Sequence, residues 1–173
     1  TFKSLQAILP WPKAFYSVTT FRGIASIIRA DLSFLSALTK LTDINLNHMN
    51  QLHGTFWPLA RLVHLTHIDL SYNQLNGTLE PLINMTNLRT LAAAHNQLVG
   101  TLEALRDLHD LKRLVLYENF GMNGTIAPIC AQLNRSVTWV QVHDTGIVQY
   151  GLSECDEGDR HYCYYKECAK VPS

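Results

Sequence analysis

The chain has 173 residues, with 14 basic and 14 acidic side chains and a formal net charge of zero at pH 7. This balance argues against nucleic acid or an anionic membrane surface as the partner, because both normally demand a basic excess. Charged residues make up 16% of the chain, below the roughly 25% of average globular proteins. No window approaches the roughly 18 to 20 apolar residues of a membrane helix, so we expect membrane attachment only through an anchor that is not present in this chain.

The first segment, residues 1–36, is predicted to cap the N-terminal end of the fold. Phe2, Leu5 and Leu9 have helical spacing ahead of two prolines, which predicts a short amphipathic helix across the open edge of the first strands. Such cover is needed because an open sheet edge invites pairing with another chain. A degenerate first repeat is indicated further on by Val18, Phe21 and Ile24.

Residues 37–147 repeat one pattern, and its glycines recur at intervals of 23, 23 and 24 residues at Gly54, Gly77, Gly100 and Gly124. The clearest copy runs through Leu62, Leu65, Ile68, Leu70, Asn73, Leu75, Gly77, Thr78 and Leu79. This pattern and period are those of a leucine-rich repeat. They predict an α/β solenoid, a leucine-rich-repeat horseshoe of about five rungs with N- and C-terminal caps, where a rung is one repeat turn of the chain.

Within each rung, alternation predicts a short strand with one buried and one solvent-facing side. Ile68 and Leu70 would point into the core while His67, Asp69 and Ser71 point outward. An asparagine follows each strand at the bend, where its amide can satisfy backbone groups that have lost their sheet partners. We therefore expect a buried asparagine ladder formed by Asn50, Asn73, Asn96 and Asn119.

The copies differ in ways that bear on the surface. Asn50 comes one residue late in its copy, which indicates an insertion in the turn. The third copy shows Ala92 and Ala94 outward, so we expect its outer face to be nearly featureless. A weaker fifth copy carries Thr145 in place of the ladder asparagine.

Residues 148–173 are predicted to form a cysteine-containing C-terminal cap. The four cysteines of the chain lie at or near this end, which favours disulfides that seal the last rung: Cys130, Cys155, Cys163 and Cys168. Four cysteines allow three pairings, and the sequence does not choose among them. Zinc bound by Cys155, His161, Cys163 and Cys168 is the alternative, but the paired Cys-x-x-Cys knuckles typical of such sites are missing, and we predict no metal and no cofactor.

Four sequons would accept glycans in a secretory pathway: Asn76, Asn84, Asn123 and Asn134. Two of them, Asn76 and Asn123, precede the Gly-Thr pair of the repeat itself, so they also arise whenever that variable position is asparagine. Together with the cysteines, the sequons indicate an extracellular or cell-surface protein.

The motif Leu-x-Gly-Thr-Leu at residues 75–79 and 98–102, with its variant Met-Asn-Gly-Thr-Ile at 122–126, is similar to the plant-type repeat. It resembles more closely the promastigote surface antigens of trypanosomatid parasites, as do the opening Thr-Phe-x-x-Leu-Gln-Ala and the cysteine-bearing final segment. Those proteins favour Gly-Thr-Leu-Pro, where this chain has Glu80 and Glu103, and their N-terminal cap cysteines and lipid-anchor signal are absent. The resemblance implies a displayed or secreted protein that adheres to host or environmental macromolecules.

The outward strand positions form the predicted concave face, about 4.8 Å apart from rung to rung. Aromatic and arginine side chains dominate measured interface energies, so Arg113, Tyr117 and Trp139 are the preferred contact residues. The remaining ligand-binding candidates on this face are Asp43, Asn45, His67, Asp69, Gln141 and His143.

Two arrangements with the composition of a chemical site fail on geometry. His67, Asp69 and Ser71 have the residue types of a hydrolase triad, but alternate residues on one strand lie about 7 Å apart, whereas a triad needs contacts near 3 Å. His48, Tyr72 and His95 share one column, but the two histidines are two rungs apart, roughly 10 Å, too far to share a metal directly.

We therefore expect no enzyme. The sequence favours an extracellular recognition or adhesion module that binds a protein or glycan partner through its concave face. The alternatives are a structural or assembly subunit of a surface coat or filament, and an inhibitor of a secreted enzyme.

Overall fold

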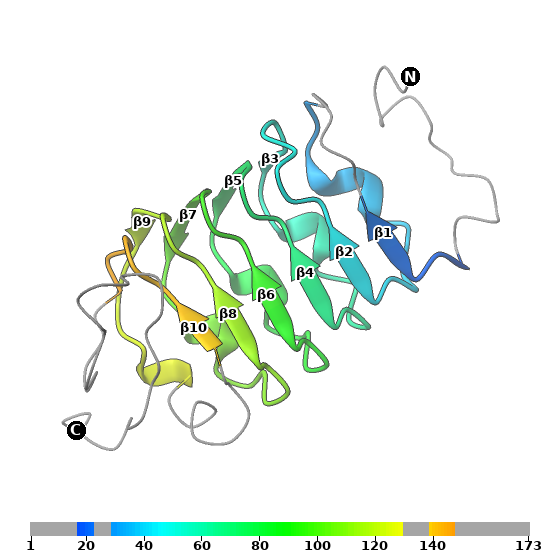
Figure 1. The fold of residues 1–173 in the computed structure, drawn as a ribbon. Coiled ribbons are helices and arrows are strands. Elements are labelled where there is room, and N and C mark those ends of the chain that lie inside the picture. The colour runs from blue at the N-terminus through cyan, green and yellow to red at the C-terminus, as the bar shows by residue number, and fades with distance from the viewer. Residues whose placement is uncertain (1–16, 23–28, 130–138, 148–173) are drawn as a thin grey trace.

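The computed structural model describes residues 17–22, 29–129 and 139–147 of the chain. Six parallel strands form one continuous sheet in the order of the sequence (Figure 1). They are β1 (Thr20–Arg22), β2 (Asp43–Asn45), β4 (His67–Asp69), β6 (Thr90–Ala92), β8 (Arg113–Val115) and β10 (Trp139–Gln141). In the first strand, Phe21 pairs in register with Ile44 of the first clear copy, the position that the predicted degenerate rung gives it.

A second set of four short strands follows the bends after β2, β4, β6 and β8 and pairs in the order β3-β5-β7-β9. These strands are β3 (His53–Gly54), β5 (Gln74–Gly77), β7 (Gln97–Gly100) and β9 (Gly121–Met122). The repeat glycine ends this segment with φ values of +78° to +86° at Gly54, Gly77, Gly100 and Gly124. A residue with a Cβ atom is strained in this left-handed region, which explains why the repeat requires glycine at this position.

The return segments of four rungs are short 3₁₀ turns, while residues 127–129 in the return segment of the next rung are α-helical. The described turns are η3 (Leu32–Leu35), η4 (Trp57–Leu59), η5 (Glu80–Leu82) and η6 (Glu103–Leu105), on the far side of the sheet in Figure 1. The apolar side chains here recur every three residues, as in Leu79, Leu82, Met85 and Leu88, all buried. Residues i and i+3 eclipse in a 3₁₀ turn, so this spacing places them on one face toward the core.

One continuous apolar core runs through all described rungs, between the main sheet and the 3₁₀ turns. Leu65, Ile68 and Leu70 of the clearest copy are fully buried. Because each rung buries its apolar face only against its neighbours, the array is stable as a stack and not as separate units.

The asparagine ladder is confirmed for three of its four predicted members. Asn73, Asn96 and Asn119 are buried. The Asn119 amide donates to Ala93 O at 2.9 Å and Leu116 O at 2.8 Å, while its Oδ1 accepts from Leu98 N–H at 3.0 Å. Thr145 continues the ladder in the fifth copy, where its hydroxyl donates to Val142 O.

The prediction was wrong for Asn50, which is exposed and has a φ of +60°. The extra residue in this turn places Met49 at the ladder position, and Met49 is 3% exposed. Asn50 donates instead to the carbonyl of His48 at 3.0 Å. An asparagine is retained here because its short polar side chain tolerates the left-handed conformation.

Candidate functional site

The solvent-facing side of the six-stranded sheet, hereafter the sheet face, carries the predicted concave-face residues in three rows. Strand register places Asp43, His67, Thr90, Arg113 and Trp139 in the first row. The second row contains Asn45, Asp69, Ala92, Val115 and Gln141. The third lies just past the strands, at Asn47, Ser71, Ala94, Tyr117 and His143.

The N-terminal half of the sheet face is a polar network. His67 Nδ1 lies 3.2 Å from Asp43 Oδ1 and 2.8 Å from the Thr66 hydroxyl. Asp69 accepts from Asn47 Nδ2 at 3.0 Å and from the backbone N–H of Ser71 at 3.2 Å. His67 and Asp69 thus bind different partners, and the geometry of a catalytic triad is not formed.

The C-terminal half carries a small apolar cluster separate from the main core, where the sequence led us to expect an almost featureless surface. Ala92, Ala94 and Val115 are at most 7% exposed, and Tyr117 and Trp139 pack against them. That expectation was wrong because the small alanine side chains leave room for the two large rings to lie over the strands. The signal was present in the sequence, since Val115 stands beside the alanines one rung later.

The three preferred contact residues gather at this cluster. The Arg113 guanidinium lies over the Trp139 ring, with Cζ 5.7 Å from the ring centroid. This is within the range of a cation–π interaction. Arg113 itself is exposed, so its charge remains available to a ligand.

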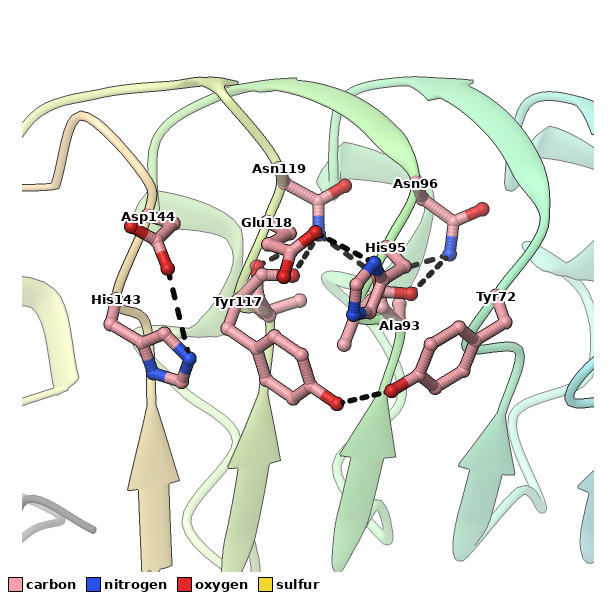
Figure 2. Close-up of polar contacts among 11 residues, drawn as sticks. Tyr72, Ala93, His95, Asn96, Tyr117, Glu118, Asn119, His143 and Asp144 are labelled. Carbon is pink, nitrogen blue, oxygen red and sulfur yellow. Dashed lines mark hydrogen bonds and ion pairs between the residues drawn. The ribbon is translucent and has the colours of Figure 1, made fainter. Parts of the chain in front are cut away.

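A row of rings continues from this cluster along the ends of the strands (Figure 2). His48, Tyr72 and His95 stack in sequence with centroids 4.0 and 4.2 Å apart. Tyr117 stacks on His143 at 4.7 Å and meets His95 edge-on at 5.1 Å. The sequence placed the first three in one column, but the link to Tyr117 and His143 was missed because those two belong to the neighbouring position of the repeat.

Two polar contacts tie the row together. The Tyr72 and Tyr117 hydroxyl groups are 2.8 Å apart, and His95 Nδ1 lies 2.7 Å from Glu118 Oε2 (Figure 2). Burial and the hydrogen bond with Tyr72 raise the pKa of Tyr117 to about 12. Tyr117 therefore stays a neutral hydrogen-bonding group throughout the physiological range.

One residue at the bend of five successive rungs has a left-handed backbone, with φ values between +50° and +59° at His48, Tyr72, His95, Glu118 and Asp144. Non-glycine residues rarely adopt this region, and each costs about 1 kcal/mol or more. The ladder amides hold it, as when Asn96 Nδ2 donates to the carbonyls of Ala93 and Ala94 at 3.0 and 3.1 Å. The row is thus fixed in place by the buried asparagines beneath it.

Three predicted glycosylation sites fall within the described residues. Asn76, Asn84 and Asn123 are exposed, and none lies on the sheet face. Asn76 lies in β5 of the second set of strands, and Asn84 follows η5. Asn134 and the four cysteines lie outside the described residues, as does the predicted N-terminal helix.

The described residues contain no group of three or more histidine, cysteine or acidic side chains that could hold a metal ion. Among the same residues there is no helix both long and apolar enough to cross a membrane.

No protein-family model matches the chain, and no curated protein matches it. Several solved structures, by contrast, are similar to the chain. The leucine-rich-repeat ectodomain of the plant receptor kinase GASSHO1/SCHENGEN3 from Arabidopsis thaliana, in complex with CASPARIAN STRIP INTEGRITY FACTOR 2, superposes with a TM-score of 0.69. It is 23% identical over 78% of this chain and 16% of that one.

The fold is a leucine-rich-repeat solenoid. Internalin C2 from Listeria monocytogenes is similar at a TM-score of 0.57 and 25% identity, over 69% of this chain and 50% of that one. The plant peptide hormone receptor RGFR1, in complex with RGF2, is similar at a TM-score of 0.63 and 25% identity, over 75% of this chain and 21% of that one. The leucine-rich-repeat chain described here spans half or less of the length of each of these three proteins.

Proposed function

We propose that this chain is an extracellular recognition module that binds a protein partner noncovalently through the sheet face. The contact centre is Arg113, Tyr117 and Trp139. The observation that carries the proposal is the alanine floor beneath the Tyr117 and Trp139 rings. Ala92 and Ala94 are buried under these side chains, on a face of the sheet that would otherwise be exposed to solvent.

Such a floor matters energetically because binding must offset the ordering of the side chains that make contact. Trp139 is fixed by Val115 and the alanines below and by the Arg113 guanidinium beside it. Tyr117 is fixed by the stack on His143 and the Tyr72 hydroxyl. Rings already held in place lose little conformational entropy on binding, which suits them as interface anchors.

The comparisons support a protein or peptide partner over a glycan. GASSHO1/SCHENGEN3 and RGFR1 are each named in complex with another polypeptide. The exposed sequons off the sheet face support both the extracellular assignment and the choice of surface, because glycans on them would leave the sheet face open. A surface-antigen role extends the same proposal.

The assembly alternative has an observation of its own. Trp57 of η4 is 63% exposed and Ile83, just after η5, is 52% exposed, both on the side opposite the sheet face. Exposed apolar side chains of this size favour contact with another surface. A coat or filament subunit would use this side and leave the sheet face unused.

One experiment separates the two. The full chain is displayed as bait against a library of secreted and cell-surface proteins, and each partner is re-measured with Arg113→Ala, Trp139→Ala and Trp57→Ala. The proposal expects Arg113→Ala and Trp139→Ala to weaken binding at least tenfold and Trp57→Ala to leave it unchanged. Binding lost in Trp57→Ala but retained in Arg113→Ala would overturn it, and because Arg113 is exposed, misfolding would not explain its effect.

A further inference from the structure

A groove of about 440 Å³ opens at the edge of the sheet where the strands begin, on the opposite edge from the ring row. Its walls are Thr42 and Thr66, which directly precede β2 and β4, and Arg89, which directly precedes β6. Lys40, His64, Asn87 and Asp110 complete the lining. Neither the sheet-face proposal nor the repeat pattern uses these residues.

Most neutral donors of the groove already have partners. The Thr66 hydroxyl donates to Thr42 O at 3.0 Å, and the Thr42 hydroxyl donates to Thr19 O at 3.1 Å. Asn87 Nδ2 donates to Val63 O at 3.1 Å. The donors left for a ligand are therefore mainly the cationic side chains.

The charged side chains of the groove are unpaired. Within the described part of the chain, Lys40, His64, Arg89 and Asp110 take part in no ion pair and no side-chain hydrogen bond. Elsewhere among the described residues, exposed charges do pair, as Arg106 does with Glu103 at 2.6 Å in the η6 turn. Two permanent cations and a histidine thus face one carboxylate without being neutralised.

The charges are also ordered along the groove. Lys40, His64, Asn87 and Asp110 hold equivalent positions in four successive rungs, so the cationic and anionic ends lie three rungs, about 14 Å, apart. An extended peptide advances about 3.3 Å per residue, and about four residues cover this distance. The groove is thus matched to an extended segment with an acidic group at one end and a basic group at the other.

We infer that this groove is a second binding site, which holds an extended peptide segment across the rungs. A carboxylate of the peptide binds Lys40 at the cationic end of the groove, beside His64 and attracted by the Arg89 charge, and a basic side chain about four residues away binds Asp110. The site is independent of the sheet face and would exist even if that surface had no partner. A free inorganic anion shares the chemistry of the carboxylate but not the second contact at Asp110.

The test titrates the isotopically labelled full chain with the capped peptide acetyl-Glu-Thr-Ser-Thr-Lys-amide and follows backbone amide signals by NMR. Signals of Thr42, Thr66 and Arg89 should shift, while those of Val115 and Trp139 on the sheet face should not. The same peptide with Gln for Glu, and sodium sulfate at equal concentration, are the ligand controls. Both should bind at least threefold more weakly.

Matched variants locate the site. Lys40→Gln and Arg89→Gln should each weaken peptide binding about threefold, which is within the range that an exposed ion pair contributes. Arg61→Gln removes an exposed cation outside the groove and should have no effect. Equal binding of the Gln peptide or of sulfate, or unchanged binding in the Lys40→Gln/Arg89→Gln double variant, would overturn the inference.

Discussion

Replacement of Asn119 by alanine should destabilise the protein more than any other single change in a bend of the repeat. Its side chain is fully buried and makes three short hydrogen bonds with the backbone. Ala93 O keeps a partner after the change, because Asn96 Nδ2 also donates to it at 3.0 Å. Leu98 N–H and Leu116 O lose the partner that the ladder gives them.

Each buried polar group left without a partner costs about 1–3 kcal/mol. Two such groups give an expected loss of about 3 kcal/mol in the free energy of unfolding for Asn119→Ala. Asn73→Ala should cost less, because Asn73 Oδ1 has no hydrogen-bond partner among the described residues and only its amide contacts are lost. Urea denaturation followed by circular dichroism measures both values.

The matched control is Asn50→Gly, which changes the asparagine one residue past the ladder position of its rung, where the side chain is exposed and the backbone left-handed. Glycine tolerates the positive φ, so the loss should stay below about 1 kcal/mol. A loss below 1 kcal/mol for Asn119→Ala, or equal losses for Asn119→Ala and Asn50→Gly, would refute the view that the ladder amides hold the bends.

Three other predictions concern the turns, the ring row and the compartment. Gly77→Ala should lower the free energy of unfolding, measured by thermal denaturation, by about 1–2 kcal/mol, because Gly77 has a φ of +78°. The new Cβ would lie 3.0 Å from the Thr55 methyl group, so Thr55→Ser should restore part of this loss. If the effects of the two substitutions simply add in the double variant, the two residues are not in contact. Folding raises the pKa of Tyr117 from 10.0 to about 12, so the stability that Tyr117 contributes below pH 10 should be lost as the pH rises through 12. Tyr117→Phe should remove this part of the loss of stability at alkaline pH. A variant whose stability depends on alkaline pH in the same way as that of the unchanged chain would show that Tyr117 does not titrate this way. Intact mass of material from the natural source should rise by four hydrogen masses on reduction and fall on enzymatic deglycosylation; free thiols without glycan would rule out the extracellular assignment.

The solenoid could be predicted from the sequence because its determinants are local and repeated. Buried leucines alternate along each strand, and the glycine of each rung has the positive φ that the spacing required. Asn50 could not be placed correctly from its residue type and its approximate place in the repeat alone. A one-residue insertion exchanges a buried for an exposed position, and only the packed neighbours show that Met49 occupies the ladder.

The site was predictable in its residues but not in its contacts. Arg113, Tyr117 and Trp139 follow from the outward strand positions, and the structure gathers them around the alanine floor. The Tyr72–Tyr117 hydrogen bond joins residues 45 positions apart, at two different positions of the repeat. Contacts of this kind depend on side-chain direction at left-handed residues, which no periodicity encodes. The groove charges were likewise hidden, because they occupy variable positions in four separate copies.

The central claim is that the sheet face is the recognition surface, and hydrogen–deuterium exchange of the chain with and without a captured partner tests it most directly. If the sheet face binds the partner, exchange in the complex should be slower at residues 90–95, 113–118 and 139–143, with η4 and η5 unchanged. Protection confined to the 3₁₀ turns around Trp57 and Ile83, with the sheet face exchanging as in the free chain, would contradict it.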